Sequence, residues 1–291
     1  MALPGVGVNA WVWTSPFDRG AVSLIARAHA LGFDAFTLTL EAPELVDVAA
    51  VRAVLADHPL RLYASGAFTP ERDLTAADPA LRARALDYLD RCLDLAAELG
   101  ARLLVGPAYA ATGKARRIPE AERKREWALA VEGLARAGEW AERRGLGLAV
   151  EPLNRYETDL VNTAAQAVRL VEAVGSPAVG IHLDTYHMHI EEKSLAEAVR
   201  LAGSRLWYLD ASECDRGAPG SGQVHWDELA RALRAVDYRG DLVIESFTPD
   251  CQALAAAAAI WRPLADGPDA LAAEGLVFLR RLLARHFAEV P

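Results

Sequence analysis

The chain has few cysteines, no paired cysteine motif and no long apolar run, and each shortage excludes a class of protein. Its three cysteines, Cys92, Cys214 and Cys251, form no CxxC pair, so neither a disulfide framework nor a thiolate zinc site is indicated. No apolar run approaches the roughly 18 residues that a membrane-spanning helix needs. The amino end lacks the basic and apolar regions of a signal peptide. These features predict a soluble, cytoplasmic protein with no membrane partner.

Basic residues are also fewer than acidic residues. The 291 residues include 31 Lys and Arg against 40 Asp and Glu, which gives a formal net charge of −9 at pH 7. An acidic surface repels phosphate backbones and anionic lipids, so we expect no nucleic-acid partner. Hydrophobic residues make up 52% of the chain and charged residues 24%, which is typical of a globular protein with a large core.

Eight short apolar runs alternate with longer amphipathic runs along the whole chain. Strands are expected at residues 6–11, 35–40, 61–66, 102–106, 147–151, 179–184, 206–211 and 241–246. Helices are expected at residues 21–31, 48–57, 80–99, 120–144, 163–174, 194–202, 226–236 and 270–287. Eight strand-then-helix units without a linker predict an α/β fold, a single (β/α)8 TIM barrel over residues 1–291. A doubly wound open sheet is the alternative, and the absence of GxGxxG after the first strand weakens it.

Four neighbouring strands of the predicted barrel each end in a carboxylate: Glu151, Asp184, Asp210 and Glu245. Active sites of such barrels lie at the carboxyl ends of the strands. One such carboxylate can cap a helix or face water, but four together repel one another. Each close pair costs on the order of 4 kcal/mol at 4 Å and an effective dielectric near 20. A divalent cation is the simplest remedy, and oxygen-rich ligands suit Mn²⁺, Mg²⁺ or Co²⁺.

Four short segments carry a resemblance to a known group. They are Glu-Pro-Leu-Asn-Arg-Tyr-Glu at 151–157, Leu-Asp-Thr-Tyr-His-Met at 183–188, Glu-Cys-Asp-Arg-Gly-Ala-Pro-Gly-Ser-Gly at 213–222 and Val-Ile-Glu-Ser-Phe at 243–247. In this order and spacing they resemble the xylose-isomerase-like superfamily of TIM barrels, and within it the ketose 3-epimerases of the D-tagatose/D-allulose 3-epimerase family. The resemblance implies inversion of a free ketose at C3 through a metal-stabilised cis-enediolate. It also implies Mn²⁺ first among the metals, with Mg²⁺ or Co²⁺ as alternatives, a small sugar as substrate, and homo-oligomers, either dimers or tetramers.

The resemblance also assigns roles to individual residues. It makes Glu151, Asp184 and Glu245 metal ligands, and Glu151 and Glu245 the two proton carriers. Glu157, His187 and Arg216 would bind the sugar oxygens. For His187 a solvated loop histidine just past the strand is the alternative, and for Arg216 an exposed ion pair.

The chain departs from the family on its seventh strand. That strand normally ends His-x-His, and the second histidine is the fourth metal ligand, whereas here the two positions hold Tyr208 and Asp210. We expect Asp210 to bind the metal directly or through a water, with an ion pair in the barrel mouth as the alternative. His182 lies two residues before Asp184 and so faces the same side of its strand. It is expected to be a core histidine with satisfied ring nitrogens, not a ligand.

Several other functions use this architecture. A ketose–aldose isomerase, a hydroxypyruvate-type isomerase or an inosose dehydratase would share most of the apparatus. A DNA-repair endonuclease of this barrel type would need many histidines and a basic groove, which the sequence lacks. A non-catalytic sugar-binding protein would have no need of two proton-carrying glutamates. Aromatic residues after the first and third strands would either stack on a sugar or stabilise the mouth; these are Trp11, Trp13, Phe17, Phe68 and Tyr109.

Overall fold

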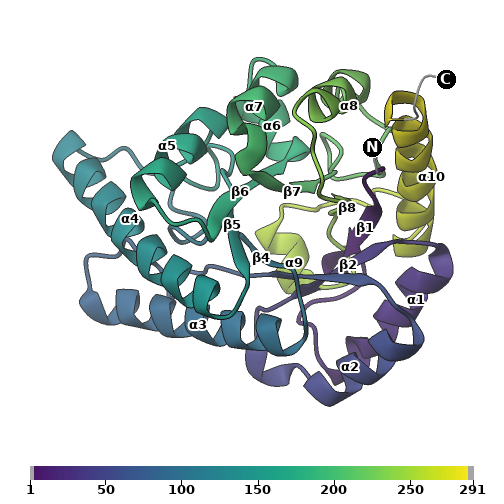
Figure 1. The fold of residues 1–291 in the computed structure, drawn as a ribbon, viewed down its shortest axis with the longest axis horizontal. Coiled ribbons are helices and arrows are strands. Elements are labelled where there is room, and N and C mark those ends of the chain that lie inside the picture. The colour runs from purple at the N-terminus through teal and green to yellow at the C-terminus, as the bar shows by residue number, and fades with distance from the viewer. Residues whose placement is uncertain (1–2, 288–291) are drawn as a thin grey trace.

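Eight parallel strands close into a barrel in the computed structural model, which describes residues 3–287 (Figure 1). The strands follow one another around the barrel in chain order: β1 Val6–Asn9, β2 Ala35–Thr39, β3 Arg61–Ser65, β4 Leu103–Gly106, β5 Gly147–Val150, β6 Val179–Asp184, β7 Leu206–Asp210 and β8 Leu242–Ile244. Pairing of β1 with β8 closes the ring. The predicted TIM barrel and its eight strands are confirmed.

Helices surround the barrel: α1 Ser23–Leu31, α2 Val48–Asp57, α3 Pro79–Glu98, α4 Glu120–Arg143, α5 Ala164–Val174, α6 Thr185–Glu191, α7 Leu195–Ala202, α8 Trp226–Ala235, α9 Gln252–Ala257 and α10 Pro268–Phe287. Their ends follow local chemistry. At the start of α5, Thr163 and Gln166 form a reciprocal capping box, and Gly175 ends the helix in the left-handed region at φ 68°.

Two of these helices, α6 and α9, were not predicted. The loop position considered as an alternative for His187 is wrong, because α6 begins immediately after Asp184. The Asp184 side chain accepts a hydrogen bond from the Tyr186 amide at 2.8 Å and so caps α6. One carboxylate therefore both ends a strand and starts a helix.

Aromatic and aliphatic side chains pack together in the barrel lumen near the amino ends of the strands. A small buried cluster fills this part of the lumen: Ala35, Tyr63, Val105, Ala149, Tyr208 and Val243. Beneath it the Trp207 ring takes the space that side chains at Gly147 and Gly180 would need; a Cβ at Gly180 would lie 2.2 Å from the ring. The four strand-end carboxylates lie toward the carboxyl ends, whereas Asp241, just before β8, accepts hydrogen bonds from Arg61 and the Tyr63 hydroxyl near the amino ends.

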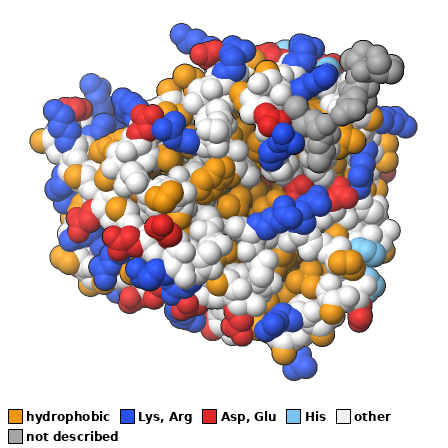
Figure 2. All heavy atoms as spheres, viewed as in Figure 1, with side chains coloured by type: hydrophobic (Ala, Val, Ile, Leu, Met, Phe, Trp, Pro, Cys, Tyr) orange, Lys and Arg blue, Asp and Glu red, His pale blue; other side chains and the backbone are white. Residues whose placement is uncertain are grey.

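The molecular surface mixes charges of both signs. Figure 2 shows acidic and basic side chains interspersed around the rim of one face. Within residues 3–287, the search for a helix both long and apolar enough to cross a membrane finds none.

Candidate active site

The four carboxylates predicted from the strand ends meet at one end of the barrel. Asp184 and Asp210 are the last residues of β6 and β7 and are register partners. Glu151 and Glu245 follow β5 and β8. All four are buried, with at most 6% of each residue exposed.

Arg216, from the loop between β7 and α8, reaches into this group. Its Nη1 donates to Asp184 Oδ2 at 2.6 Å, to Glu245 Oε2 at 3.0 Å and to Ser212 Oγ at 2.8 Å. The guanidinium lies 4.0 Å from the centre of the Tyr186 ring. Arg216 is 5% exposed, so the exposed ion pair considered from the sequence is wrong.

The backbone of Arg216 has a conformation that side chains rarely adopt. Its φ is 66°, in the left-handed region, which costs about 1 kcal/mol or more for a residue with a side chain. The Ser246 hydroxyl donates to the Arg216 carbonyl at 2.6 Å and holds the backbone there. The loop thus holds Arg216 in a strained backbone conformation that places its guanidinium against two carboxylates.

Glu245 is held by a second residue, which the sequence did not single out. Asn9, the last residue of β1, donates from Nδ2 to Glu245 Oε1 at 3.2 Å. The carboxylate therefore has Asn9 on one oxygen and Arg216 on the other. In the sequence, the Asn9 side-chain amide at the end of a strand was the sole sign of this role. The contact with Glu245 could not be predicted, because it forms only when the barrel closes.

His187 lies on α6, and its hydrogen bonds determine its tautomer. Its Nδ1 accepts the backbone N–H of Asn154 at 3.1 Å, so Nε2 carries the proton in the neutral ring. Nε2 lies 3.5 Å from Glu151 Oε1, 3.6 Å from Asp184 Oδ2 and 3.4 Å from Arg216 Nη2. His187 is 3% exposed, so it is not a solvated loop histidine and instead presents an N–H to the site.

Glu157 lies in the loop after β5 and is partly exposed. Its Oε1 accepts from Asn154 Nδ2 at 2.7 Å. Asn154 therefore positions both His187 and Glu157, a role that the sequence did not reveal. The structure brings all seven predicted site residues to this end of the barrel.

The expectation that the ring nitrogens of His182 are satisfied is wrong. His182 is buried, as predicted, but neither of its ring nitrogens has a hydrogen-bond partner among the described residues. Nε2 lies 2.8 Å from Asp210 Oδ2 and Nδ1 lies 3.6 Å from Glu151 Oε2. Asp210 Oδ1 is likewise buried without a partner.

Burial and mutual repulsion displace the pKa values of the site. Burial raises the pKa of Glu151 well above its usual range, and repulsion from Glu245, Asp184 and Asp210 adds to the effect. Burial also raises the pKa of Asp210 and of Glu245. For Asp184 burial is the largest single effect and acts in the same direction, but the Arg216 guanidinium, the Tyr186 amide and the two histidines together lower its pKa.

The two histidines shift in the direction that keeps them neutral. Burial lowers the pKa of His182 to about 3 and that of His187 to about 4. At neutral pH the site therefore contains two neutral imidazoles.

The residues present fit a divalent cation. Two overlapping sets have ligand atoms within 4.8 Å of one another: Glu151 with Asp184 and His187, and Glu151 with His182 and Asp210. The unpartnered atoms of His182 and Asp210 are buried lone pairs of the kind that such an ion satisfies. Four carboxylates against one guanidinium also leave an excess of negative charge, so the cluster could hold a metal.

Most of the aromatic residues noted in the sequence stabilise the fold. Phe17, Phe68 and Tyr109 are at most 3% exposed and belong to the main hydrophobic core. Trp11 lies at the mouth, where its ring centre is 5.6 Å from that of Phe247. Phe247 also lies 4.9 Å from the Arg216 guanidinium.

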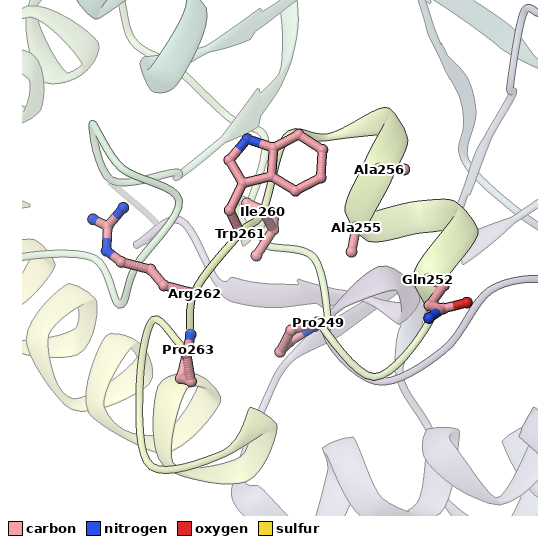
Figure 3. Close-up of a pocket in the computed structure, with 8 residues that line it drawn as sticks. All are labelled: Pro249, Gln252, Ala255, Ala256, Ile260, Trp261, Arg262 and Pro263. Carbon is pink, nitrogen blue, oxygen red and sulfur yellow. The ribbon is translucent and has the colours of Figure 1, made fainter.

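The segment after β8 encloses a surface pocket of about 300 Å³. Figure 3 shows Pro249, Ala255 and Ile260 around it and Arg262 extending away. Trp261, on its rim, is 78% exposed. The pocket is lined by none of the four carboxylates, so it does not coincide with the charged cluster.

Comparisons with known proteins agree with this architecture. Residues 25–282 match the family described as xylose isomerase-like TIM barrel. The L-ribulose 3-epimerase of Methylomonas sp. (strain DH-1) is 34% identical over 278 residues, covering 94% of this chain and 96% of the relative. The ketose 3-epimerase of Arthrobacter globiformis is 33% identical, covering 94% and 95%. A crystal structure of a D-allulose 3-epimerase from Methylomonas sp. has a TM-score of 0.91 and 33% identity, covering 97% of this chain and 100% of that one.

Proposed function

This chain belongs to the xylose isomerase-like TIM barrel family, and on that premise we propose that it is a metal-dependent ketose 3-epimerase. It is an isomerase, as its relatives named L-ribulose 3-epimerase and ketose 3-epimerase are. The observation that carries the finer proposal is the pair Glu151 and Glu245, buried at the ends of β5 and β8 in one charged cluster.

Epimerisation at C3 needs two groups that exchange protons with opposite faces of one carbon. The proton on C3 is acidified by the neighbouring C2 carbonyl. One carboxylate removes it, an enediolate forms across C2 and C3, and the other carboxyl returns a proton to the opposite face. β5 and β8 are three strands apart in a ring of eight, so Glu151 and Glu245 approach the lumen from different sides.

The electrostatics of the cluster suit a pair in which one carboxyl acts as the acid and the other as the base. The pKa values of Glu151 and Glu245 are both raised, by burial first and by neighbouring carboxylates second. Such a pair favours one proton shared between the two groups, so that one carboxyl is an acid while the other is a base. Reversal of the two roles gives the reverse reaction.

Neighbouring residues would bind the sugar and the metal. His187 offers its Nε2–H, Arg216 its remaining guanidinium donors and Glu157 its carboxylate to sugar hydroxyls. Glu151, Asp184, Asp210 and Glu245 are the oxygen ligands proposed for Mn²⁺, with Mg²⁺ or Co²⁺ as alternatives. When bound, the cation would stabilise the negative charge that develops on the sugar oxygens.

The test is isotope incorporation. Protein loaded with Mn²⁺ is incubated in D₂O with a panel of free ketoses, and the recovered sugars are analysed by NMR. Deuterium at C3 together with the C3 epimer supports the proposal. Deuterium at C1 or C2 would instead identify an aldose–ketose isomerase, and unchanged sugars across the panel would favour a binding protein.

A further inference from the structure

His182 is the buried polar group for which the proposed chemistry has no use. It lies on β6 with 1% of its surface exposed, and neither ring nitrogen has a hydrogen-bond partner among the described residues. Leaving such a group unpaired costs on the order of 1–3 kcal/mol. Its nitrogens nevertheless face two carboxylates, Asp210 at 2.8 Å and Glu151 at 3.6 Å.

The nearby His187 does not share this property. The backbone N–H of Asn154 occupies its Nδ1, so Nε2 is protonated and has no lone pair to offer. At His182 no donor claims either nitrogen. Of the two imidazoles in the cluster, His182 is therefore the one free to coordinate a cation.

The charges of the cluster are also unevenly compensated. Arg216 pairs with Asp184 and Glu245. Within residues 3–287, no Lys or Arg forms an ion pair with Glu151 or Asp210. Among the basic side chains of this range, only His182 and His187 lie within 4 Å of these two carboxylates. The uncompensated negative charge thus lies beside His182.

We propose that His182 is a ligand of the metal centre, and that Glu151, His182 and Asp210, from three consecutive strands, form its mixed imidazole–carboxylate face. The 2.8 Å between His182 Nε2 and Asp210 Oδ2 lacks hydrogen-bond alignment. It is close to the roughly 3 Å that separates adjacent ligands with bonds of about 2.1 Å to one ion. This inference rests on the metal dependence within the proposed function and not on the identity of the sugar.

The imidazole changes the expected metal preference. A shell of carboxylates alone favours Mg²⁺ and Mn²⁺, whereas a nitrogen ligand moves the preference along the series toward Co²⁺. We therefore expect Mn²⁺ and Co²⁺ to bind more tightly than Mg²⁺.

Pulsed electron paramagnetic resonance of Mn²⁺-loaded protein tests the proposal, because it detects a ¹⁴N nucleus bonded to the ion. Wild type should show this coupling. His182→Leu should lose it and bind Mn²⁺ at least ten-fold more weakly, as measured by equilibrium dialysis. His182→Gln, which keeps a polar side chain of similar size, repeats the test should the leucine variant fail to fold. His187→Gln is the matched control and should keep the coupling.

The outcomes separate this inference from the proposed function. Mn²⁺ bound by wild type without nitrogen coupling, or a coupling that disappears in His187→Gln and survives in the His182 variants, would overturn the role of His182 alone. A wild-type protein that binds no Mn²⁺ would overturn the metal dependence itself, and the inference with it.

Discussion

Glu151 carries two opposed effects in a single side chain. Its buried carboxyl has a raised pKa, so the folded state is penalised when the group ionises. A folded-state pKa above the unfolded one means that the contribution to stability is present below about pH 4.3 and is lost as the pH rises through the folded value. A residue proposed to move protons thus destabilises the metal-free fold at neutral pH.

We expect Glu151→Gln to abolish deuterium incorporation and to raise the melting temperature of the metal-free protein by a few degrees at pH 8. Glutamine carries no charge to desolvate, so the ionisation penalty of the wild-type carboxyl disappears in the variant. At pH 4 the wild-type carboxyl is protonated and the difference should vanish. Scanning calorimetry in EDTA at the two pH values measures it, and activity close to wild type would rule out Glu151 as a proton carrier.

Arg216 acts on the same cluster with the opposite charge. Replacing it with alanine removes the partner of Asp184 and Glu245 and the proposed donors to the sugar. We expect Arg216→Ala to lower kcat/KM by at least a hundred-fold while Mn²⁺ affinity stays equal or rises, since a competing cation is gone. Arg216→Lys keeps the positive charge but not the planar, two-pronged guanidinium, so its kcat/KM should lie between those of wild type and Arg216→Ala. Metal content that drops in parallel with activity would show that Arg216 instead supports the metal.

At the scale of an element, the loop between β7 and α8 is organised around one carboxylate. Glu213 is fully buried and accepts four hydrogen bonds, from the amides of Cys214, Gly220 and Val224 and from the Trp226 indole. Burial opposes its ionisation, but these bonds lower its pKa. The buried Glu213 carboxylate therefore stabilises the loop that positions Arg216.

Glu213→Gln should destabilise the protein by about 1–3 kcal/mol, because the amide NH₂ then faces N–H donors. It should also lower kcat/KM through the loosened Arg216. Glu228→Gln is the control: Glu228 likewise accepts two hydrogen bonds, from Ser194 and Ala196, outside the charged cluster. Urea unfolding and steady-state kinetics on both variants give the comparison, and equal kcat/KM losses in the two would contradict a specific role for this loop.

The strands and long helices were predictable because each carries its own periodicity, whereas α6 was not. Its seven residues start at a strand end and are too few to show a helical repeat. The contacts of Asn9 and His182 were hidden for another reason. Asn9 meets Glu245 only because β1 pairs with β8, and His182 is placed by a register shift on β6 between Ile181 and His182. The strand-end carboxylates were found because the carboxyl ends of the parallel strands of a barrel all meet at one rim.

For the whole molecule, metal binding and folding should be linked. The cluster proposed to hold the ion forms only when four strands are assembled, so an ion that binds the folded state alone would stabilise it. Saturation at about 100 times the dissociation constant contributes about 2.7 kcal/mol. The predicted dimer or tetramer and the cytoplasmic location stay predictions.

We expect Mn²⁺ to raise the melting temperature of EDTA-treated protein by about 5 °C or more, with KCl at equal ionic strength as the control. Addition of excess EDTA should reverse the shift. Identical melting curves with and without Mn²⁺ would argue against a metal held by the folded barrel.

The Trp207 ring, packed at the amino end of the lumen, has a consequence for successive turnovers of the proposed reaction. Because the lumen cluster and the Trp207 ring fill the barrel's amino-terminal end, a sugar in the proposed site would enter and leave from the carboxyl end. In the proposed reaction each inversion at C3 would leave the shared proton on the carboxyl that had acted as base, which is the protonation state that suits the reverse reaction. Exchange of that proton with solvent would then take place between the release of one sugar and the binding of the next, an interval that a higher sugar concentration would shorten. At high sugar concentration the enzyme would thus often begin a turnover in the protonation state that the previous turnover had left.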